Sequence, residues 1–249
     1  MSDVSVQWQI DGYCGKLRCG PLAGHVEPAV LGERFRPTLW RGTSVRNFFV
    51  LLTAAGEPYD YNLVERHIRG RDLVDVFPKL TARISNEAIW RASFHRAVDS
   101  VQLELVCSTQ TDLLDSNPIE MIQTHIAPAR VFHCEDLRAG RFGELEAVDY
   151  PGIEFQALDS REHLTLFRND EIGLSYAEMV HPTDFVSAQH FSNDAHLRSS
   201  VSVLFPERME KGVIRRGRIC GWFLPAENDL ATAVELARQF VDEPLPLTA

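Results

Sequence analysis

The stretch Val4-Ser5-Val6-Gln7-Trp8-Gln9-Ile10 alternates apolar and polar side chains without interruption. Successive side chains of a β-strand point to opposite faces of the sheet. The alternation therefore predicts a strand with one face in a core and the other towards water. Residues 101–107 repeat the pattern, broken only at Val106. A period of two, rather than the 3.6 of a helix, is the main signal in this chain.

Further short apolar stretches follow along the chain, separated by Gly, Pro, Asn or Asp as expected of antiparallel sheets. They cover residues 48–52, 88–94, 130–134, 153–158, 164–167, 174–180, 197–205 and 213–224. The sequence predicts a mainly β fold, an antiparallel β-sandwich. No Gly-rich turn between a strand and a helix supports a nucleotide-binding unit.

One helix is predicted near the end of the sequence. We expect Asn228 as its N-cap and Asp229 in its first turn, with proline ending it at Pro244 and Pro246. Its apolar face would comprise Leu230, Val234, Ala237 and Val241. A shorter helical or irregular segment is expected around residues 113–124, where Asn117-Pro118 marks a boundary.

Composition and charge narrow the classes of function. The chain has 249 residues, 45% of them hydrophobic, and a formal net charge of −10. That charge repels phosphate backbones and anionic lipid, so we expect neither a nucleic-acid nor a membrane partner. The N-terminal residues lack a basic segment followed by an apolar one, so no secretion signal is predicted and we expect a cytoplasmic protein. Five cysteines without CxxC spacing are expected to be reduced thiols.

The chain is expected to form one domain over residues 1–249, with an internal duplication of about 1–122 and 150–249. In both halves an apolar strand precedes a turn that carries Asp, an apolar residue and Val. A strand with Arg, a small residue and Ser then follows. Asp72 and Arg91 hold these places in the first half, and Asp184 and Arg198 in the second. Two related β-rich halves would suit a large sandwich.

The repeated charged residues are the candidate ligand site. An Asp and an Arg on neighbouring strands can form a charge-assisted pair, and such pairs in a cleft bind carboxylates, phosphates or sugar hydroxyls. The candidate binding residues are Asp72, Arg91, His181, Asp184 and Arg198. The competing interpretation is structural: each Asp caps a turn and each Arg lies on the sheet surface.

No catalytic or cofactor motif is found. Nine histidines include neither HxH nor HExxH, and a trio such as His181, His190 and Asp184 is one of many that can be drawn. We therefore predict no metal site and no cofactor. The sequence has no Gly-x-Ser-x-Gly nucleophile motif, and paired acids are too common among 35 acidic residues to indicate a glycosidase.

Part of the chain resembles an uncharacterised family from planctomycete-type bacteria. The residues that carry the resemblance are His67-Ile68-Arg69-Gly70-Arg71-Asp72-Leu73-Val74, Trp90-Arg91, 103–106, 109–116 and 175–185. This resemblance implies no activity. Two matched β-rich halves are also similar in architecture to the supersandwich of aldose mutarotases, although the acid–base His and carboxylate motifs of that family do not map onto this sequence.

Two hypotheses of function follow. The first is a non-catalytic binding or assembly protein that self-associates, because no catalytic constellation is recognisable. The alternative is a carbohydrate-binding or mutarotase-like protein with a small polar ligand such as a sugar, which requires a concave pocket with a His and a carboxylate on one ligand. Whether the protein is an enzyme stays open at this stage.

Overall fold

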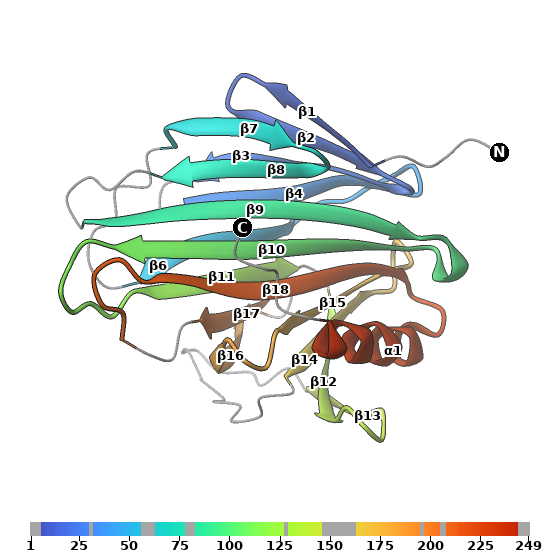
Figure 1. The fold of residues 1–249 in the computed structure, drawn as a ribbon. Helices are drawn as coiled ribbons and strands as arrows, with labels where there is room; N and C mark the ends of the chain where they lie inside the picture. Colours follow the sequence, from blue (N-terminus) through green and yellow to red (C-terminus); the bar gives the residue numbers. More distant parts are fainter. Residues whose placement is uncertain are drawn as a thin grey trace.

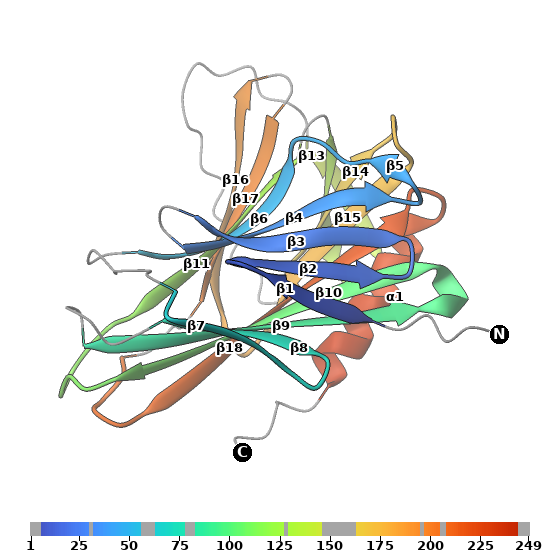
Figure 2. The same ribbon diagram turned by 90° about the horizontal axis from the view of Figure 1, so that it is seen from above.

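The chain folds into two antiparallel β-sheets that face each other, with an α-helix against one of them (Figures 1 and 2). The computed structural model describes residues 6–29, 32–55, 63–77, 83–126, 129–145, 163–194, 197–204 and 208–243. The predicted antiparallel β-sandwich with a C-terminal helix is confirmed. No helix in these ranges is long and apolar enough to cross a membrane.

Sheet A has the strand order β1-β2-β3-β4-β6-β11-β17-β16, with β5 paired to β4, among the described residues. Its strands are β1 (Gln7–Asp11), β2 (Cys14–Cys19), β3 (Leu22–Ala29), β4 (Gly32–Trp40), β5 (Thr43–Ser44), β6 (Phe48–Ala55), β11 (Ile119–Ile126), β16 (Phe185–Asp194) and β17 (Leu197–Leu204).

Sheet B has the order β13-β12-β14-β15-β18-β10-β9-β8-β7. Its strands are β7 (Glu65–Arg69), β8 (Asp72–Phe77), β9 (Ile84–His95), β10 (Ser100–Thr111), β12 (Arg130–Asp136), β13 (Arg141–Leu145), β14 (Leu164–Asn169), β15 (Leu174–Val180) and β18 (Ile214–Pro225). A 3₁₀ turn, η1 (Arg96–Val98), joins β9 to β10.

The main core lies between the sheets. Phe35 of sheet A contacts Trp90 and Phe223 of sheet B, with ring centroids 6.3 and 6.0 Å apart. Phe48 and Tyr176 meet edge to face at 4.9 Å across the same space. These offset and edge-on geometries are the favourable ones for aromatic pairs. The alternation that predicted the strands thus supplies the inward face of each sheet.

Helix α1 (Asp229–Asp242) covers the outer face of sheet B and forms a second core there. Trp222 of β18 packs edge to face on Phe240 of the helix, 5.8 Å between centroids. Asn228 holds the predicted N-cap position, but it has a φ of +57° and its side chain makes no cap bond. Its carbonyl oxygen instead accepts hydrogen bonds from the N–H and hydroxyl of Thr232.

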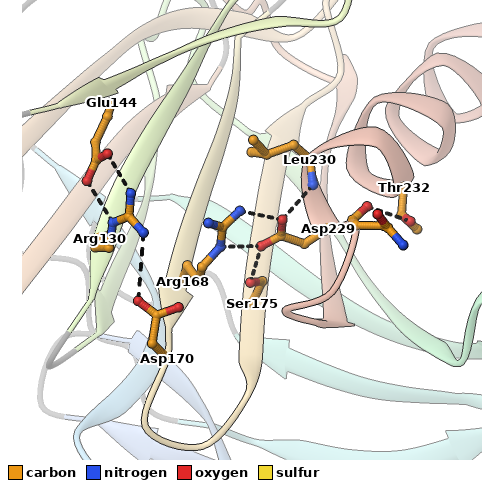
Figure 3. Close-up of polar contacts among 9 residues, drawn as sticks. Arg130, Glu144, Arg168, Asp170, Ser175, Asp229, Leu230 and Thr232 are labelled. Atoms are coloured by element: carbon orange, nitrogen blue, oxygen red, sulfur yellow. Dashed lines mark hydrogen bonds and ion pairs between the residues drawn. The ribbon is translucent and has the colours of Figure 1, made fainter.

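Asp229 anchors the first turn of the helix to sheet B (Figure 3). Its side chain is 2% exposed and receives two bonds from Arg168 of β14, at 2.8 and 2.5 Å. The hydroxyl of Ser175 and the N–H of Leu230 donate to the same carboxylate. A buried carboxylate needs partners of this kind to offset the loss of its hydration.

Two further expectations concern residues 113–124 and 153–158. Of the helical or irregular segment expected around residues 113–124, the irregular alternative holds for 113–118 and the helical one is wrong, since β11 begins at Ile119. The expected strand at 153–158 lies outside the described residues.

Each half contributes strands to both sheets. The paired segments behind the duplication have different settings: residues 68–74 turn between β7 and β8 within sheet B, whereas residues 180–186 pass from β15 in sheet B to β16 in sheet A. The duplication stays a prediction.

Candidate functional site

A hollow of about 900 Å³ lies along strands β1 to β4 of sheet A, beside the turn between β7 and β8. We call it the β1–β4 hollow. Its polar lining includes Gln7, Gln9, Lys16, Arg18, His25, Glu27, Thr38 and Arg71. Trp8 also lines it, and the buried indole N–H of Trp8 has no hydrogen-bond partner. Trp8 pairs with the core residue Leu17, so its indole lies on the inward side of sheet A, away from the outward charged groups of the hollow.

Strand alternation and register place these polar groups together. Val26 and Phe35 face the core with no exposed surface, so His25 and Glu27 on β3 and Arg34 and Arg36 on β4 face outwards. His25 lies opposite Arg36, and Glu27 opposite Arg34, across the β3–β4 pair. Residues directly opposite in an antiparallel pair have Cβ atoms about 5 Å apart, which brings their charged ends into contact.

Glu27 is held from both sides. Its Oε1 lies 2.8 Å from Nη2 of Arg34 and 3.0 Å from Nε of Arg36, and its Oε2 lies 3.4 Å from Nε2 of His25. All four side chains stay between 26% and 43% exposed, so the charged groups remain within reach of a ligand. Charge-assisted bonds of this kind fix the orientation of a carboxylate.

The guanidinium groups of both arginines lie over an aromatic ring. Their guanidinium carbons lie 5.5 Å (Arg34) and 5.9 Å (Arg36) from the ring centroid of Phe49 on β6. The Phe49 ring stacks on His125 of β11, with centroids 4.3 Å apart. Burial lowers the pKa of His125 below its ordinary 6.5. A neutral imidazole stacked under Phe49 repels the two guanidinium groups above the ring less strongly than an imidazolium would.

The structure brings the residues proposed from sequence together only in part. Asp72 and Arg91 lie directly opposite each other on β8 and β9, with Arg91 Nε 3.0 Å from Asp72 Oδ2. His181 and Asp184 share the turn between β15 and β16, where Asp184 N–H donates to the His181 carbonyl. Arg198 is on β17 in sheet A, and its side chain lies outside the described residues.

Arg218 and Glu104 connect the two pairs across sheet B. Arg91 Nη1 is 3.7 Å from one Glu104 oxygen, and Arg218 Nη1 is 3.6 Å from the other. The backbone N–H of Arg218 donates to Asp184 at 3.0 Å, and its carbonyl accepts from the N–H of His181. The Asp184 carboxylate therefore bonds to the backbone of β18 and to the hydroxyl of Thr183, whereas the turn itself is closed by the backbone bond from Asp184 to His181. That these residues bind a ligand stays a prediction.

A separate histidine cluster lies between the sheets at the edge where β12 and β14 approach β16. One ring nitrogen from each of His133, His163 and His190 lies within 4.8 Å of the others. The ring centroids are 5.0, 5.4 and 6.4 Å apart. The trio drawn from the sequence, with His181 and Asp184, is not the one that forms: His190 joins His133 and His163 instead.

Comparison with known proteins bears on the fold. No family model and no curated protein matches the sequence. A solved structure named "putative aldose 1-epimerase" from Escherichia coli K12 aligns with a TM-score of 0.52 at 10% identity, over 89% of this chain and 100% of that one. The chain has an aldose epimerase-like fold. A TPR-domain containing protein from Parabacteroides distasonis aligns at 0.50 and 7% identity, over 85% of this chain and 47% of that protein. At such identities the likeness shows the fold alone.

The sequence carries a signal for the charged outward face of β3 and β4, which lines the hollow. His25 and Glu27 alternate with Val26, and Arg34 and Arg36 alternate with Phe35, which is a strand pattern with an outward charged face. No comparable signal existed for the histidine cluster. His133, His163 and His190 are separated by 30 and 27 positions, and only the packing of the two sheet edges brings them together.

Proposed function

We propose that this chain is a binding protein for a small acidic carbohydrate, and that the ligand sits in the β1–β4 hollow. The observation that carries the proposal is the hollow itself, in which the oriented carboxylate of Glu27 lies with Lys16, Arg18 and His25 on the outward face of sheet A. Its volume of about 900 Å³ suits a small ligand. The likeness in fold to a protein named for an aldose supports a sugar.

The charges around the hollow favour an acidic sugar. Among its described lining residues, Lys16, Arg18 and Arg71 are cationic and Glu27 carries the one carboxylate. This local excess of positive charge stands against a net charge of −10 for the chain. Guanidinium groups bind carboxylates and phosphates through paired hydrogen bonds, so a uronate or a sugar phosphate should bind more tightly than the neutral sugar.

Distances across the sheet favour binding over catalysis by paired histidines. His25 is on β3 and His125 on β11, and β4 and β6 separate these strands. Three strand spacings amount to about 14 Å, which is more than one sugar ring can bridge. The two histidines therefore cannot act as acid and base on the same ring, as a mutarotase-like reaction at this site would require.

Isothermal titration with glucose, glucuronate and glucose 6-phosphate tests the proposal. We expect saturable binding, tightest for the two anionic sugars, and a loss of about tenfold or more in affinity in Lys16→Gln and in Arg18→Gln, because each change removes a cation that pairs with the anionic group. Arg141→Ala on β13, 63% exposed and outside the hollow, is the matched control and should bind as the wild type does.

Binding that survives both hollow variants unchanged would contradict the location of the site. The absence of binding to any of the three sugars would contradict the function. Self-association stays a separate prediction, and light scattering of the same samples with and without ligand measures it.

A further inference from the structure

The three-histidine cluster of His133, His163 and His190 is built from separate parts of the fold. His133 is on β12, His163 directly precedes β14, and His190 is on β16 at the edge of sheet A. Val131 and Phe167 mark the core-facing sides of β12 and β14. Two-residue alternation therefore turns His133 and His163 towards the space between the sheets. Rings contributed by two sheets converge on one point.

All three rings have an unsatisfied nitrogen. The Nδ1 atoms of His133, His163 and His190 are buried and have no hydrogen-bond partner. His163 is only 1% exposed, so solvent does not satisfy it. Buried polar atoms in native proteins almost always have partners, and three orphans in one cluster need a common explanation. A bound cation that accepts their lone pairs supplies one.

The rings have the protonation state that metal binding needs. Burial lowers the pKa of His190 to about 4, and that of His163 falls well below 6.5 through burial and the neighbouring His190 and His133. Burial also lowers the pKa of His133, partly opposed by Glu135. A neutral imidazole has a lone pair on one ring nitrogen, which is the form that binds a metal ion.

Thr165 on β14 supports two of the rings from behind. Its Oγ1 lies 2.9 Å from Nε2 of His163 and 3.4 Å from Nε2 of His190. Metal-bound histidines commonly use their second ring nitrogen in a hydrogen bond that fixes the ring and its tautomer. Thr165 holds the position of such a partner for His163 and His190. The Nδ1 atoms of these two rings then remain without a hydrogen-bond partner.

We propose that His133, His163 and His190 bind a divalent first-row transition-metal ion such as Zn²⁺. Three imidazoles without a thiolate are a donor set that suits zinc, copper, nickel or iron. Zinc–nitrogen bonds of 2.0–2.1 Å in a tetrahedron place ligand nitrogens about 3.3 Å apart. The ligand nitrogens now lie within 4.8 Å of one another, and small rotations of the rings would bring them to the zinc-bound spacing. A three-histidine set leaves the fourth position of the tetrahedron for water or another ligand.

Metal content tests the site directly. The full chain is stripped with a chelator, equilibrated with Zn²⁺, freed of loose metal by gel filtration and analysed by mass spectrometry for zinc. We expect one ion per chain, and the same experiment with Co²⁺ should give the visible absorption of a four-coordinate ion. His133→Gln and His190→Gln should each weaken binding by about 100-fold or more, because loss of a ligand exceeds the 10–100-fold effect of losing a supporting residue.

Two further variants separate ligation from folding. His67→Gln on β7, where the histidine is 40% exposed and outside the cluster, should retain zinc as the wild type does. Thr165→Val should weaken zinc binding by about 10–100-fold while circular dichroism stays unchanged. A stripped wild type that takes up no zinc, or zinc uptake that is equal in the His133, His190 and His67 variants, would overturn the proposal. Sugar titrations on the same samples report on the β1–β4 hollow independently.

Discussion

At the scale of single residues, His190 shows how the interior between two sheets changes the chemistry of a side chain. Removal from water disfavours the charged imidazolium, and the nearby His133 disfavours it further. The folded pKa of about 4 lies below the ordinary 6.5. Between these values the unfolded chain binds a proton that the folded chain does not, so folding loses stability as the pH falls.

The magnitude of this loss gives a testable result. The shift from 6.5 to about 4 corresponds to about 3 kcal/mol in the free energy of unfolding, present above pH 6.5 and lost progressively down to pH 4. We expect urea unfolding at pH 7.5 and pH 4.5 to show this dependence, and His190→Gln to reduce it. The metal-free protein is the sample to use. An identical pH dependence in wild type and His190→Gln would contradict the assignment.

The sequence predicts single residues less well than it predicts strands. The pairing of Asp72 with Arg91 is predictable because these residues lie on β8 and β9, two strands that are consecutive in the sequence. The histidine cluster depends on the meeting of two sheet edges, and the sequence does not specify that distance. No sequence motif marks Arg218, although it is 3% exposed and joins both halves of the network on sheet B.

At the scale of elements, the attachment of helix α1 depends on one carboxylate. Asp229→Ala removes the acceptor of two Arg168 bonds and leaves that guanidinium without its buried partner. Breaking such a pair costs about 3–5 kcal/mol. We expect the urea midpoint to fall accordingly and the near-ultraviolet signal of Trp222, which packs under the helix, to change.

Glu144→Ala is the matched control for Asp229→Ala. Glu144 forms a similar two-bond pair with Arg130, at 2.8 and 2.7 Å, but both side chains are nearly half exposed (Figure 3). Exposed pairs add little to stability, so this variant should unfold close to the wild-type midpoint. An Asp229→Ala chain as stable as the Glu144→Ala chain would show that the helix is held by its apolar face alone.

The elements themselves were largely readable because burial follows the period of two. Strands β10, β14, β15 and β18 were expected at nearly their observed positions. Strands β3 and β4 were missed, since their outward residues are charged and the apolar run is interrupted. Asn117-Pro118 does mark a boundary, but the element that follows it is strand β11, because a proline before the first residue of a strand and one in the first turn of a helix look alike in sequence.

At the scale of the whole molecule, both halves of the chain share one core. Leu17 and Phe35 from the first half pack in the same cluster as Tyr176 and Phe223 from the second. Neither half could keep its side of this core if the other unfolded. We therefore expect one cooperative urea transition, with tryptophan fluorescence and far-ultraviolet circular dichroism coinciding. Two separated transitions would indicate independent halves.

The layered architecture was predictable from the sequence, whereas the arrangement of strands was not. Alternation predicts which residues face inwards but does not predict which strand pairs with which. That β11 lies between β6 and β17, far from its sequence neighbours β10 and β12 in the other sheet, follows from long-range pairing alone.

Strand β18 occupies the middle of sheet B, between β15 and β10, although it is the last strand of the described chain to be synthesised. While the ribosome is still producing residues before Ile214, β7–β10 and β12–β15 can exist only as separate fragments. The facing edges of β10 and β15 then expose unpaired backbone groups, which attract strands from other nascent chains. A cell that makes this protein must protect those edges until translation has passed Pro225, so slow decoding or chaperone shortage over that interval should send it into aggregates.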